Sequence, residues 1–126
     1  MAGRSLIDRI IRGPIVDHWH DAAACKNKPT EWWYSDLKDD NNQITPNARK
    51  ALRQCFQCPV RVECLTHALT YPEYDGIWGA MTEHQRRRLM YRVRSGEVAA
   101  ADAIGVALDI ADEAGAKLGL TDRRSA

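Results

Sequence analysis

Four cysteines are the residues of this chain whose type and spacing point most directly to chemistry. Cys55 and Cys58 form a CxxC pair, and Cys64 follows after five further residues. Cys25 stands alone far upstream, so the set differs from the two short cysteine pairs of most structural zinc sites. Four thiolates can hold a tetrahedral zinc ion or a cubane iron–sulfur cluster. The residues alone therefore leave three interpretations open: a zinc site, an iron–sulfur site, or thiols that bind no metal.

The bulk composition is that of a soluble protein with a modest core, and the N-terminus lacks the pattern of a secretory signal. At 126 residues the chain fits one domain with a tail, and 28% charged against 7% aromatic residues predicts a modest core. The sequence has no run of about 18 apolar residues, and Asp8, Arg9 and Arg12 interrupt the apolar N-terminus where a secretory signal would be continuous. We expect a cytoplasmic protein, in which clustered cysteines more often bind metal than form disulfides.

The elements that position the cysteines are predicted to be helices, in an all-α domain of about four to six short helices organised around the metal centre. Before and just up to the first cysteine, two short helices are expected over about residues 5–11 and 18–25. Residues 26–43 are polar and rich in turn formers around one aromatic cluster, Trp32-Trp33-Tyr34. This stretch is predicted to be an ordered loop, and loops of that length usually have a function.

Two further helices are predicted to bring the remaining cysteines to the core. Thr45-Pro46 is a strong helix start, with threonine as the cap and proline at the first helical position. Pro59 breaks the chain just after Cys58, and the next helix is expected over about residues 60–70. Helical spacing places one set of side chains on a shared face of each helix, namely Ala48, Ala51, Leu52 and Cys55 on the first, and Val60, Cys64, His67 and Ala68 on the second.

The segment after these helices combines a glycine turn with a basic helix. Gly76 and Gly79 bracket Ile77 and Trp78, which predicts a tight turn with positive φ and Trp78 at its tip. We call residues 76–80 the Gly-Trp turn. The sequence Thr82-Glu83-His84-Gln85 then predicts a capping box at the start of a helix that ends near Ser95-Gly96. A last amphipathic helix is expected over about residues 97–118, with a stripe of Val98, Ala101, Ile104, Leu108 and Ala111.

Four landmarks follow one another in a fixed order between about Trp19 and Leu89, ahead of a threonine-capped basic helix. They are Trp19 six residues before Cys25, then Pro29-Thr30-Glu31-Trp32-Trp33, then Cys55-Phe56-Gln57-Cys58-Pro59-Val60-Arg61-Val62-Glu63-Cys64, and then Gly76-Ile77-Trp78-Gly79-Ala80. This arrangement resembles the WhiB-like family of actinobacteria and their phages. The last residue of the Gly-Trp turn, Ala80, is a departure, because the family more often has glycine there.

The resemblance implies a specific cofactor and partners. It implies a 4Fe-4S cluster that is ligated by Cys25, Cys55, Cys58 and Cys64 and is sensitive to oxygen and nitric oxide. It further implies regulation of transcription through the primary sigma factor of RNA polymerase and promoter DNA. After cluster loss, the CxxC cysteines are close enough in sequence to form a disulfide.

The tryptophans gather around the cysteines in the sequence, and two roles are open to them. They can form the core, or they can anchor a protein partner, since tryptophan is enriched at interface hot spots. In similar family members these aromatics pack against the C-terminal domain of the primary sigma factor. The residues expected at this sigma-factor interface are Trp19, Trp32, Trp33 and Trp78, together with the turn glycines Gly76 and Gly79.

Five arginines and no acid occur between His84 and Arg94. They can form a solvated helix face or contact DNA phosphates, which are a natural counter-charge. The predicted DNA-binding set is Arg86, Arg87, Arg88, Arg92 and Arg94. The last thirty or so residues lean acidic instead of carrying a basic tail, so direct DNA reading is expected to be weak, and this segment is predicted to bind a partner or to fold back on the domain.

The predicted organisation is an N-terminal extension over 1–17, an iron–sulfur domain over 18–95 and a helical, acidic-leaning tail over 96–126. The chain is predicted not to be an enzyme, because no paired carboxylates, glycine-rich phosphate loop or nucleophile motif occurs. Two alternatives remain open. One is a thiol-disulfide oxidoreductase that uses Cys55 and Cys58, although the strand and helix alternation of thioredoxin-like folds is missing. The other is a zinc-stabilised interaction module without redox function.

Overall fold

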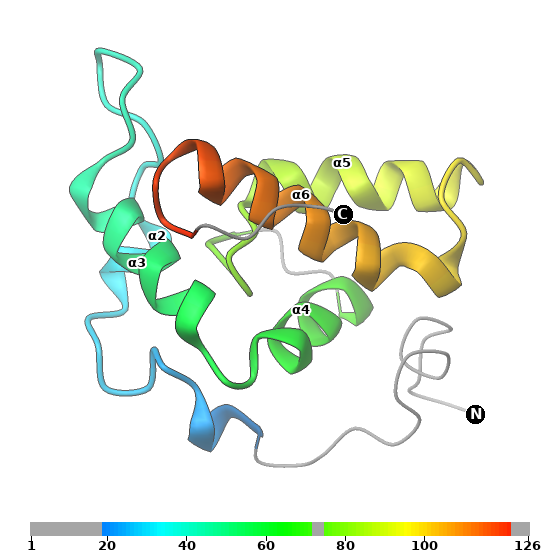
Figure 1. The fold of residues 1–126 in the computed structure, drawn as a ribbon, viewed down its shortest axis with the longest axis horizontal. Coiled ribbons are helices and arrows are strands. Elements are labelled where there is room, and N and C mark those ends of the chain that lie inside the picture. The colour runs from blue at the N-terminus through cyan, green and yellow to red at the C-terminus, as the bar shows by residue number, and fades with distance from the viewer. Residues whose placement is uncertain (1–18, 72–74, 122–126) are drawn as a thin grey trace.

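The computed structural model describes residues 19–71 and 75–121, and within them the chain is helical (Figure 1). The described part forms no strand, and isolated antiparallel bridges join Lys38 with Ile44 and Trp78 with Met81. The predicted all-α class is confirmed. The helix expected over residues 5–11 and the extension over 1–17 lie outside the described residues. The elements are η1 (Trp19–Ala22), α2 (Glu31–Tyr34), α3 (Pro46–Gln57), α4 (Arg61–Thr70), α5 (Glu83–Arg94), η2 (Ala100–Asp102) and α6 (Ala103–Lys117).

Helix α3 forms as its sequence predicts. The Thr45 hydroxyl accepts a hydrogen bond from the Ala48 amide at 3.3 Å, and Pro46 occupies the first turn. The residues predicted to share one side of this helix are all buried, namely Ala48, Ala51, Leu52 and Cys55. The helix ends at Gln57, where the Cys58 amide donates back to the carbonyl of Cys55 at 3.1 Å.

Helix α4 begins within one residue of its predicted start, but its predicted face divides. Val60 and Ala68 are buried, whereas Cys64 and His67 are only partly buried because they line a cavity. The side of α4 that enters the core is formed instead by Leu65, Thr66, Ala68 and Leu69.

The region before α3 contains less helix near the first cysteine and more helix in the loop than predicted. The helix expected over 18–25 is a single 3-10 turn in its described part, Trp19–Ala22. Inside the predicted loop, Glu31–Tyr34 forms one helical turn with Trp33 buried. One turn leaves no periodic pattern in a sequence, and packing against α3 stabilises it here.

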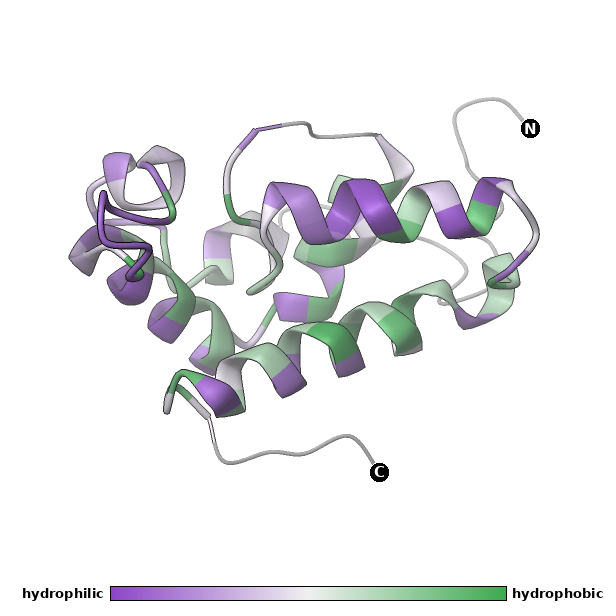
Figure 2. Cartoon of the chain, turned by 90° about the horizontal axis from the view of Figure 1, so that it is seen from above, coloured by the Kyte–Doolittle hydropathy of each residue, from purple (hydrophilic) through white to green (hydrophobic). Residues whose placement is uncertain are grey.

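The core consists of two adjoining clusters, and α6 contributes to both. Side chains of α4 and α5 pack with Ile104 and Ala107 of α6 in one cluster, and α2, α3 and the Gly-Trp turn pack with Ala111 in the other. Of the two roles predicted for the segment after residue 95, the structure therefore has the helix folded back on the domain (Figures 1 and 2). The 18–95 and 96–126 boundaries remain a prediction about domain organisation.

The stripe predicted for the last helix is partly wrong. Ala101 is exposed and Leu108 only partly buried, because the chain first makes the 3-10 turn η2 and α6 starts at Ala103. This shift changes the register of the buried side, which consists of Ala103, Ile104, Ala107, Ala111, Asp112 and Gly115. Hydrophilic residues cover most of α5, while α6 is largely apolar (Figure 2). Among the described residues, no helix has both the length and the apolar character needed to cross a membrane.

Candidate metal centre

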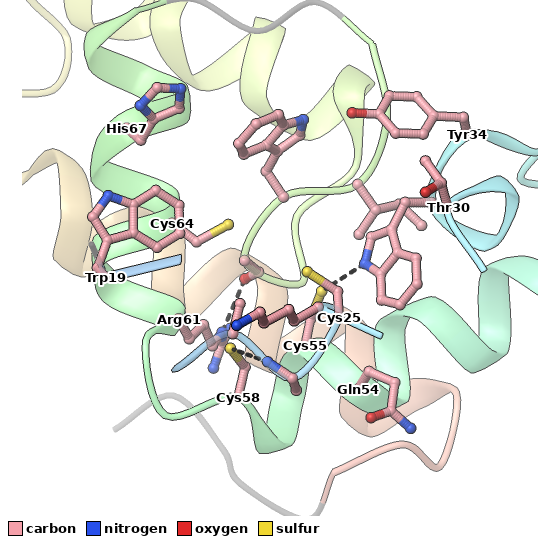
Figure 3. Close-up of a pocket in the computed structure, with 17 residues that line it drawn as sticks. Trp19, Cys25, Thr30, Tyr34, Gln54, Cys55, Cys58, Arg61, Cys64 and His67 are labelled. Atoms are coloured by element: carbon pink, nitrogen blue, oxygen red, sulfur yellow. Dashed lines mark hydrogen bonds between the residues drawn. The ribbon is translucent and has the colours of Figure 1, made fainter. Parts of the chain in front are cut away.

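All four cysteines line one cavity of about 520 Å³ (Figure 3). Cys25 comes from the segment after η1, Cys55 and Cys58 come from the end of α3, and Cys64 comes from α4. A water molecule occupies about 30 Å³ in the liquid, so this cavity has room for a group much larger than one water or one metal ion. The structure thus brings together the four residues that the sequence singled out, from three separate segments.

The thiols differ in their burial. Cys55 is buried, Cys58 and Cys64 are partly buried, and Cys25 is exposed. Burial raises the pKa of the Cys55 and Cys64 thiols, and negative charge on the neighbouring cysteines raises both further. These two thiols therefore hold their protons until a cation displaces them. A raised pKa is the opposite of what a catalytic thiol needs, because the thiolate is the nucleophile.

Nitrogen donors surround the sulfur atoms. The indole Nε1 of Trp33 donates to the Sγ of Cys55 at 3.3 Å, and the Ala24 amide donates to the Sγ of Cys58 at 3.4 Å. Backbone hydrogen bonds from Gly79 to Cys64 and from Ala80 to Cys55 act to lower the pKa of these thiols, against the effect of burial. Such donors stabilise a charged sulfur, whether thiolate or metal-bound.

The Gly-Trp turn delivers two of these donors, and its backbone has the positive φ predicted from its glycines. The φ angles are +81° at Gly76, +61° at Gly79 and +70° at Ala80. At Gly79 a Cβ atom would lie 3.1 Å from the Arg61 carbonyl oxygen and would overlap the Leu65 side chain, so a glycine is required there. Ala80 adopts the left-handed region with a side chain, at a cost of about 1–2 kcal/mol.

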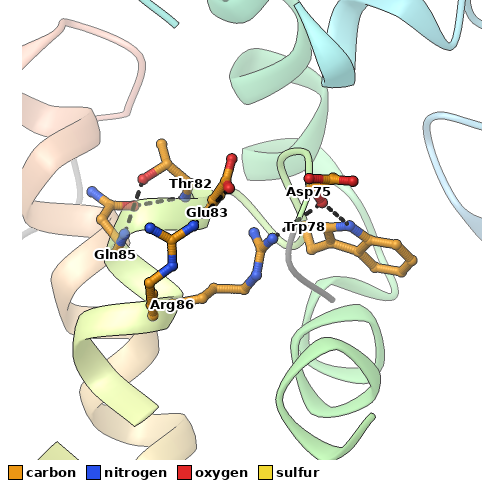
Figure 4. Close-up of polar contacts among 7 residues, drawn as sticks. Asp75, Trp78, Thr82, Glu83, Gln85 and Arg86 are labelled. Carbon is orange, nitrogen blue, oxygen red and sulfur yellow. Dashed lines mark hydrogen bonds and ion pairs between the residues drawn. The ribbon is translucent and has the colours of Figure 1, made fainter. Parts of the chain in front are cut away.

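Two buried arginines hold the segment that contains this turn. The Nε of Arg61 donates to the Gly79 carbonyl at 2.9 Å. From the other side, the Nη1 of Arg86 donates to the Met81 carbonyl at 2.7 Å. The Nη2 of Arg86 donates to the Asp75 carbonyl at 3.2 Å (Figure 4). Both guanidinium groups thus donate hydrogen bonds to backbone carbonyls in the turn or directly beside it.

The placement of Arg86 corrects one prediction. Arg86 is 3% exposed, so it does not belong to the surface that could contact DNA. The reason is its position in α5, where it follows the capping box by one residue and faces the turn. That capping box is present as predicted, with Thr82 and Gln85 each bonding the other's backbone.

The other arginines of α5 lie toward solvent, but two of them pair with acidic residues that lie just outside the acid-free stretch from His84 to Arg94. Arg87 pairs with Glu83 at 2.8 Å, and Arg92 pairs with Glu97 at 3.0 Å. Arg88 and Arg94 are exposed and form no ion pair with another described residue. Exposed pairs contribute about 0–1 kcal/mol, so a phosphate could replace either acidic partner.

The tryptophans divide between the core and the rim of the cavity. Trp33 is 7% exposed and lies in the core, so its ring does not form the contact surface that was predicted for it. Trp32 stacks on Trp33, with 5.8 Å between the ring centroids. Around the ring of His67, Trp78 stacks at 5.4 Å and Trp19 lies tilted at 6.0 Å. These three partly buried rings form an aromatic rim on one side of the cavity, whereas Trp32 does not line it. Gly76 also lies outside it.

Sequence reasoning missed one pair of residues at the site. Arg61 lines the cavity and donates from Nη1 to the Asp112 carboxylate at 2.8 Å, and both side chains are buried. The available signal was Asp112 itself, a charged residue directly after Ala111 on the apolar side of a helix. Its partner could not be named, because the two residues are 51 positions apart.

Comparison with known proteins places the chain in a family. Residues 19–89 match the family model described as transcription factor WhiB. This stretch is more than half of the chain and contains all four cysteines and the Gly-Trp turn. The chain belongs to the WhiB family of transcriptional regulators. The resemblance identified from the cysteine spacing and the tryptophan segments is therefore confirmed.

Individual relatives of this WhiB-family chain are proteins named as transcriptional regulators. It is 36% identical over 90 residues to WhiD of Streptomyces coelicolor, which covers 70% of this chain and 80% of that protein. It is 37% identical over 74 residues to WhiB2 of Mycobacterium tuberculosis, covering 59% of this chain and 75% of that protein. WhiB1 of Mycobacterium tuberculosis is 31% identical over 74 residues, covering 59% and 86%. The family match ends within α5, so α6 lies beyond it.

Proposed function

We propose that this chain is a redox- and nitric-oxide-responsive transcriptional regulator of the cytoplasm, without enzymatic activity, that holds a 4Fe-4S cluster on Cys25, Cys55, Cys58 and Cys64. It acts with the primary sigma factor of RNA polymerase at promoter DNA. One observation is central to the proposal: four cysteines from three segments share one cavity, and nitrogen donors reach their sulfurs, in a chain of the WhiB family.

The donors and the space fit a cluster better than a single ion. Zinc would draw four sulfurs to about 2.3 Å from one centre. Within the described residues, no group of three cysteine, histidine or acidic side chains is placed to hold one metal ion. Four thiols around about 520 Å³ suit a cubane, whose metal atoms are spread over a larger volume. The buried Nη2 of Arg61, which has no hydrogen-bond partner in the described structure, adds a cationic donor beside this cavity.

A bound 4Fe-4S cluster would supply a centre that reacts with oxygen and nitric oxide. The residues of this chain control access to it. Cys25 is the exposed ligand, so small oxidants would arrive on its side, whereas Cys55 lies buried behind the Trp33 indole. Loss of the Cys25 ligand would free the segment after η1, which also gives the Ala24 donor to Cys58. The state of the centre would thereby change the surface next to the aromatic rim.

Metal analysis of anaerobically purified protein tests the cofactor. We expect a brown protein with about four iron and four sulfide per chain, which bleaches in air or nitric oxide. Replacing Cys64 by serine should abolish the colour, because it removes one of the four ligands. A colourless protein that contains one zinc per chain would refute the cluster and support an interaction module stabilised by zinc.

The aromatic rim is the proposed sigma-factor contact. Trp19 and Trp78 are partly exposed beside the cavity, and aromatic anchors of this kind are enriched at interface hot spots. Trp78→Ala should weaken co-purification with the sigma C-terminal domain at least about tenfold, the ratio that about 1.4 kcal/mol produces. The matched control is Tyr91→Ala, an aromatic that is 67% exposed on α5. Equal binding by both variants and by the wild type would contradict the assignment.

Promoter contact is proposed for the exposed arginines of α5 and not for Arg86. Arg88 and Arg94 are the best placed, because neither has an acidic partner in the described residues. Replacing both with glutamine should reduce the salt dependence of promoter binding by the polymerase complex, and the slope should change by about one for each phosphate that is no longer neutralised. Lys117→Gln, which removes an exposed positive charge from α6, is the control.

A further inference from the structure

Arg61 sits at the junction of three parts of the molecule. It is the first residue of α4, lies between Cys58 and Cys64 in the sequence, and is 6% exposed. Its Nε reaches the Gly79 carbonyl, its Nη1 reaches Asp112, and its guanidinium carbon lies 4.8 Å from the centre of the Phe56 ring. One side chain therefore joins the Gly-Trp turn, α6 and the end of α3.

Helix α6 is fitted closely to this junction. Asp112 is 2% exposed and faces Arg61 from the buried side of the helix. One turn later, Gly115 leaves room for the Phe56 ring, whose Cε2 atom would lie 2.6 Å from a Cβ atom there. At the end of the helix, the Leu118 carbonyl accepts a hydrogen bond from Arg49 of α3 at 3.0 Å. These contacts fix the register of α6 against α3 and α4.

The hydrogen-bonding capacity of Arg61 is only partly used among the described residues. The Asp112 carboxylate balances its charge and accepts from Nη1, while Nη2 is buried without a hydrogen-bond partner in the described structure. A buried donor of this kind costs about 1–3 kcal/mol if it stays unpaired. The cavity that Arg61 lines also contains four cysteines, and four thiolates leave a bound cluster with net negative charge. The cationic donor and the anionic group thus complement each other.

We propose that Arg61 is a positioning residue, oriented by Asp112, through which α6 holds the Gly-Trp turn over the cysteines and sets how long the bound group is retained. The inference rests on the proposed function for the nature of that group. The inference goes beyond the proposed function because it gives α6, a helix outside the family-matched residues 19–89, a role in retaining the bound group. The coupling is reciprocal, so occupancy of the cavity stabilises the docking of α6.

Charge removal at Asp112 provides the first test. In the holoprotein, Asp112→Asn should speed the loss of visible absorbance in air-saturated buffer about tenfold, the ratio that about 1.4 kcal/mol produces. Asp109→Asn removes the same charge from the exposed side of α6 and should change the rate by less than about twofold. Equal rates for the two variants would overturn the proposal.

A double variant separates positioning from simple packing. Arg61→Met combined with Asp112→Leu replaces the ion pair by apolar groups of similar size, an exchange that often leaves a protein as stable or more so. A purely structural pair would then be dispensable, and absorbance loss would match the wild type. The proposal expects loss to remain about tenfold faster at unchanged thermal stability, because nothing holds the Gly79 carbonyl.

Thiol alkylation of the metal-free full chain gives a readout that needs no cluster. Cys64 should be alkylated by iodoacetamide about tenfold faster in the double variant than in wild type, because the turn that covers it is released. If the wild type binds no iron, the proposed function fails while this comparison still decides the role of Arg61. Unchanged alkylation of Cys64 in the double variant would overturn that role.

Discussion

Replacing Gly79 by alanine should destabilise the protein severely, because the substitution has two separate free-energy costs that add together. The backbone at Gly79 has φ of +61°, which costs an alanine about 1–2 kcal/mol. The new methyl group would also lie 2.9 Å from Cδ2 of Leu65, a residue with no exposed surface, and overpacking of this kind costs about 1–3 kcal/mol. The expected loss of unfolding free energy is therefore about 2–5 kcal/mol.

Gly96 supplies a matched control for this variant. Its φ is +87°, but no atom beyond Gly96 and its two chain neighbours lies within 4 Å of the position that a Cβ would occupy. Gly96→Ala should therefore cost only the strain of about 1–2 kcal/mol. Anaerobic thermal denaturation followed by circular dichroism measures both, with about 4 °C expected per kcal/mol for a chain of this size. If Gly79→Ala melts within about 2 °C of Gly96→Ala, the argument from Leu65 is wrong.

Three further substitutions test other parts of the fold and site. Gly105→Ala, in an open position of α6, should raise the unfolding free energy by about 0.8–1 kcal/mol in urea titrations, because alanine is the better helix former. Thr82→Ala should lower it by about 0.5–2 kcal/mol through loss of the cap on the Gln85 amide, whereas Thr82→Ser should not. Trp33→Phe keeps a ring and removes the donor to Cys55, so the reduction potential of the bound cluster should fall in a spectroelectrochemical titration; an unchanged potential would count against that hydrogen bond.

Local signals in the sequence were sufficient for the elements that begin with strong caps. Thr45-Pro46 and the box from Thr82 to Gln85 each define a helix start by hydrogen bonds over three residues, and α3 and α5 begin there. The positive φ of the Gly-Trp turn follows from its glycines in the same local way. The meeting of four cysteines at one cavity was also foreseeable, since the metal ligation predicted from their spacing would require it.

The remaining features depend on contacts between distant residues. A run of arginines gives no sign that Arg86 turns inward, because its partners are carbonyls of a turn outside the helix. Trp33 and its neighbour Trp32 look alike in sequence, and only the packing of α2 on α3 decides which ring is buried. The late start of α6 likewise follows from a 3-10 turn that no periodicity reveals.

The ion pair between Arg61 and Asp112 also has a consequence for the order in which the protein is made. Synthesis runs from the N-terminus, so all four cysteines leave the ribosome before α6 exists. The carboxylate that fixes Arg61 arrives 51 residues after it. A nascent chain therefore presents its thiols while Arg61, which lines their cavity, still lacks its carboxylate partner, and that ion pair forms only when the last helix docks.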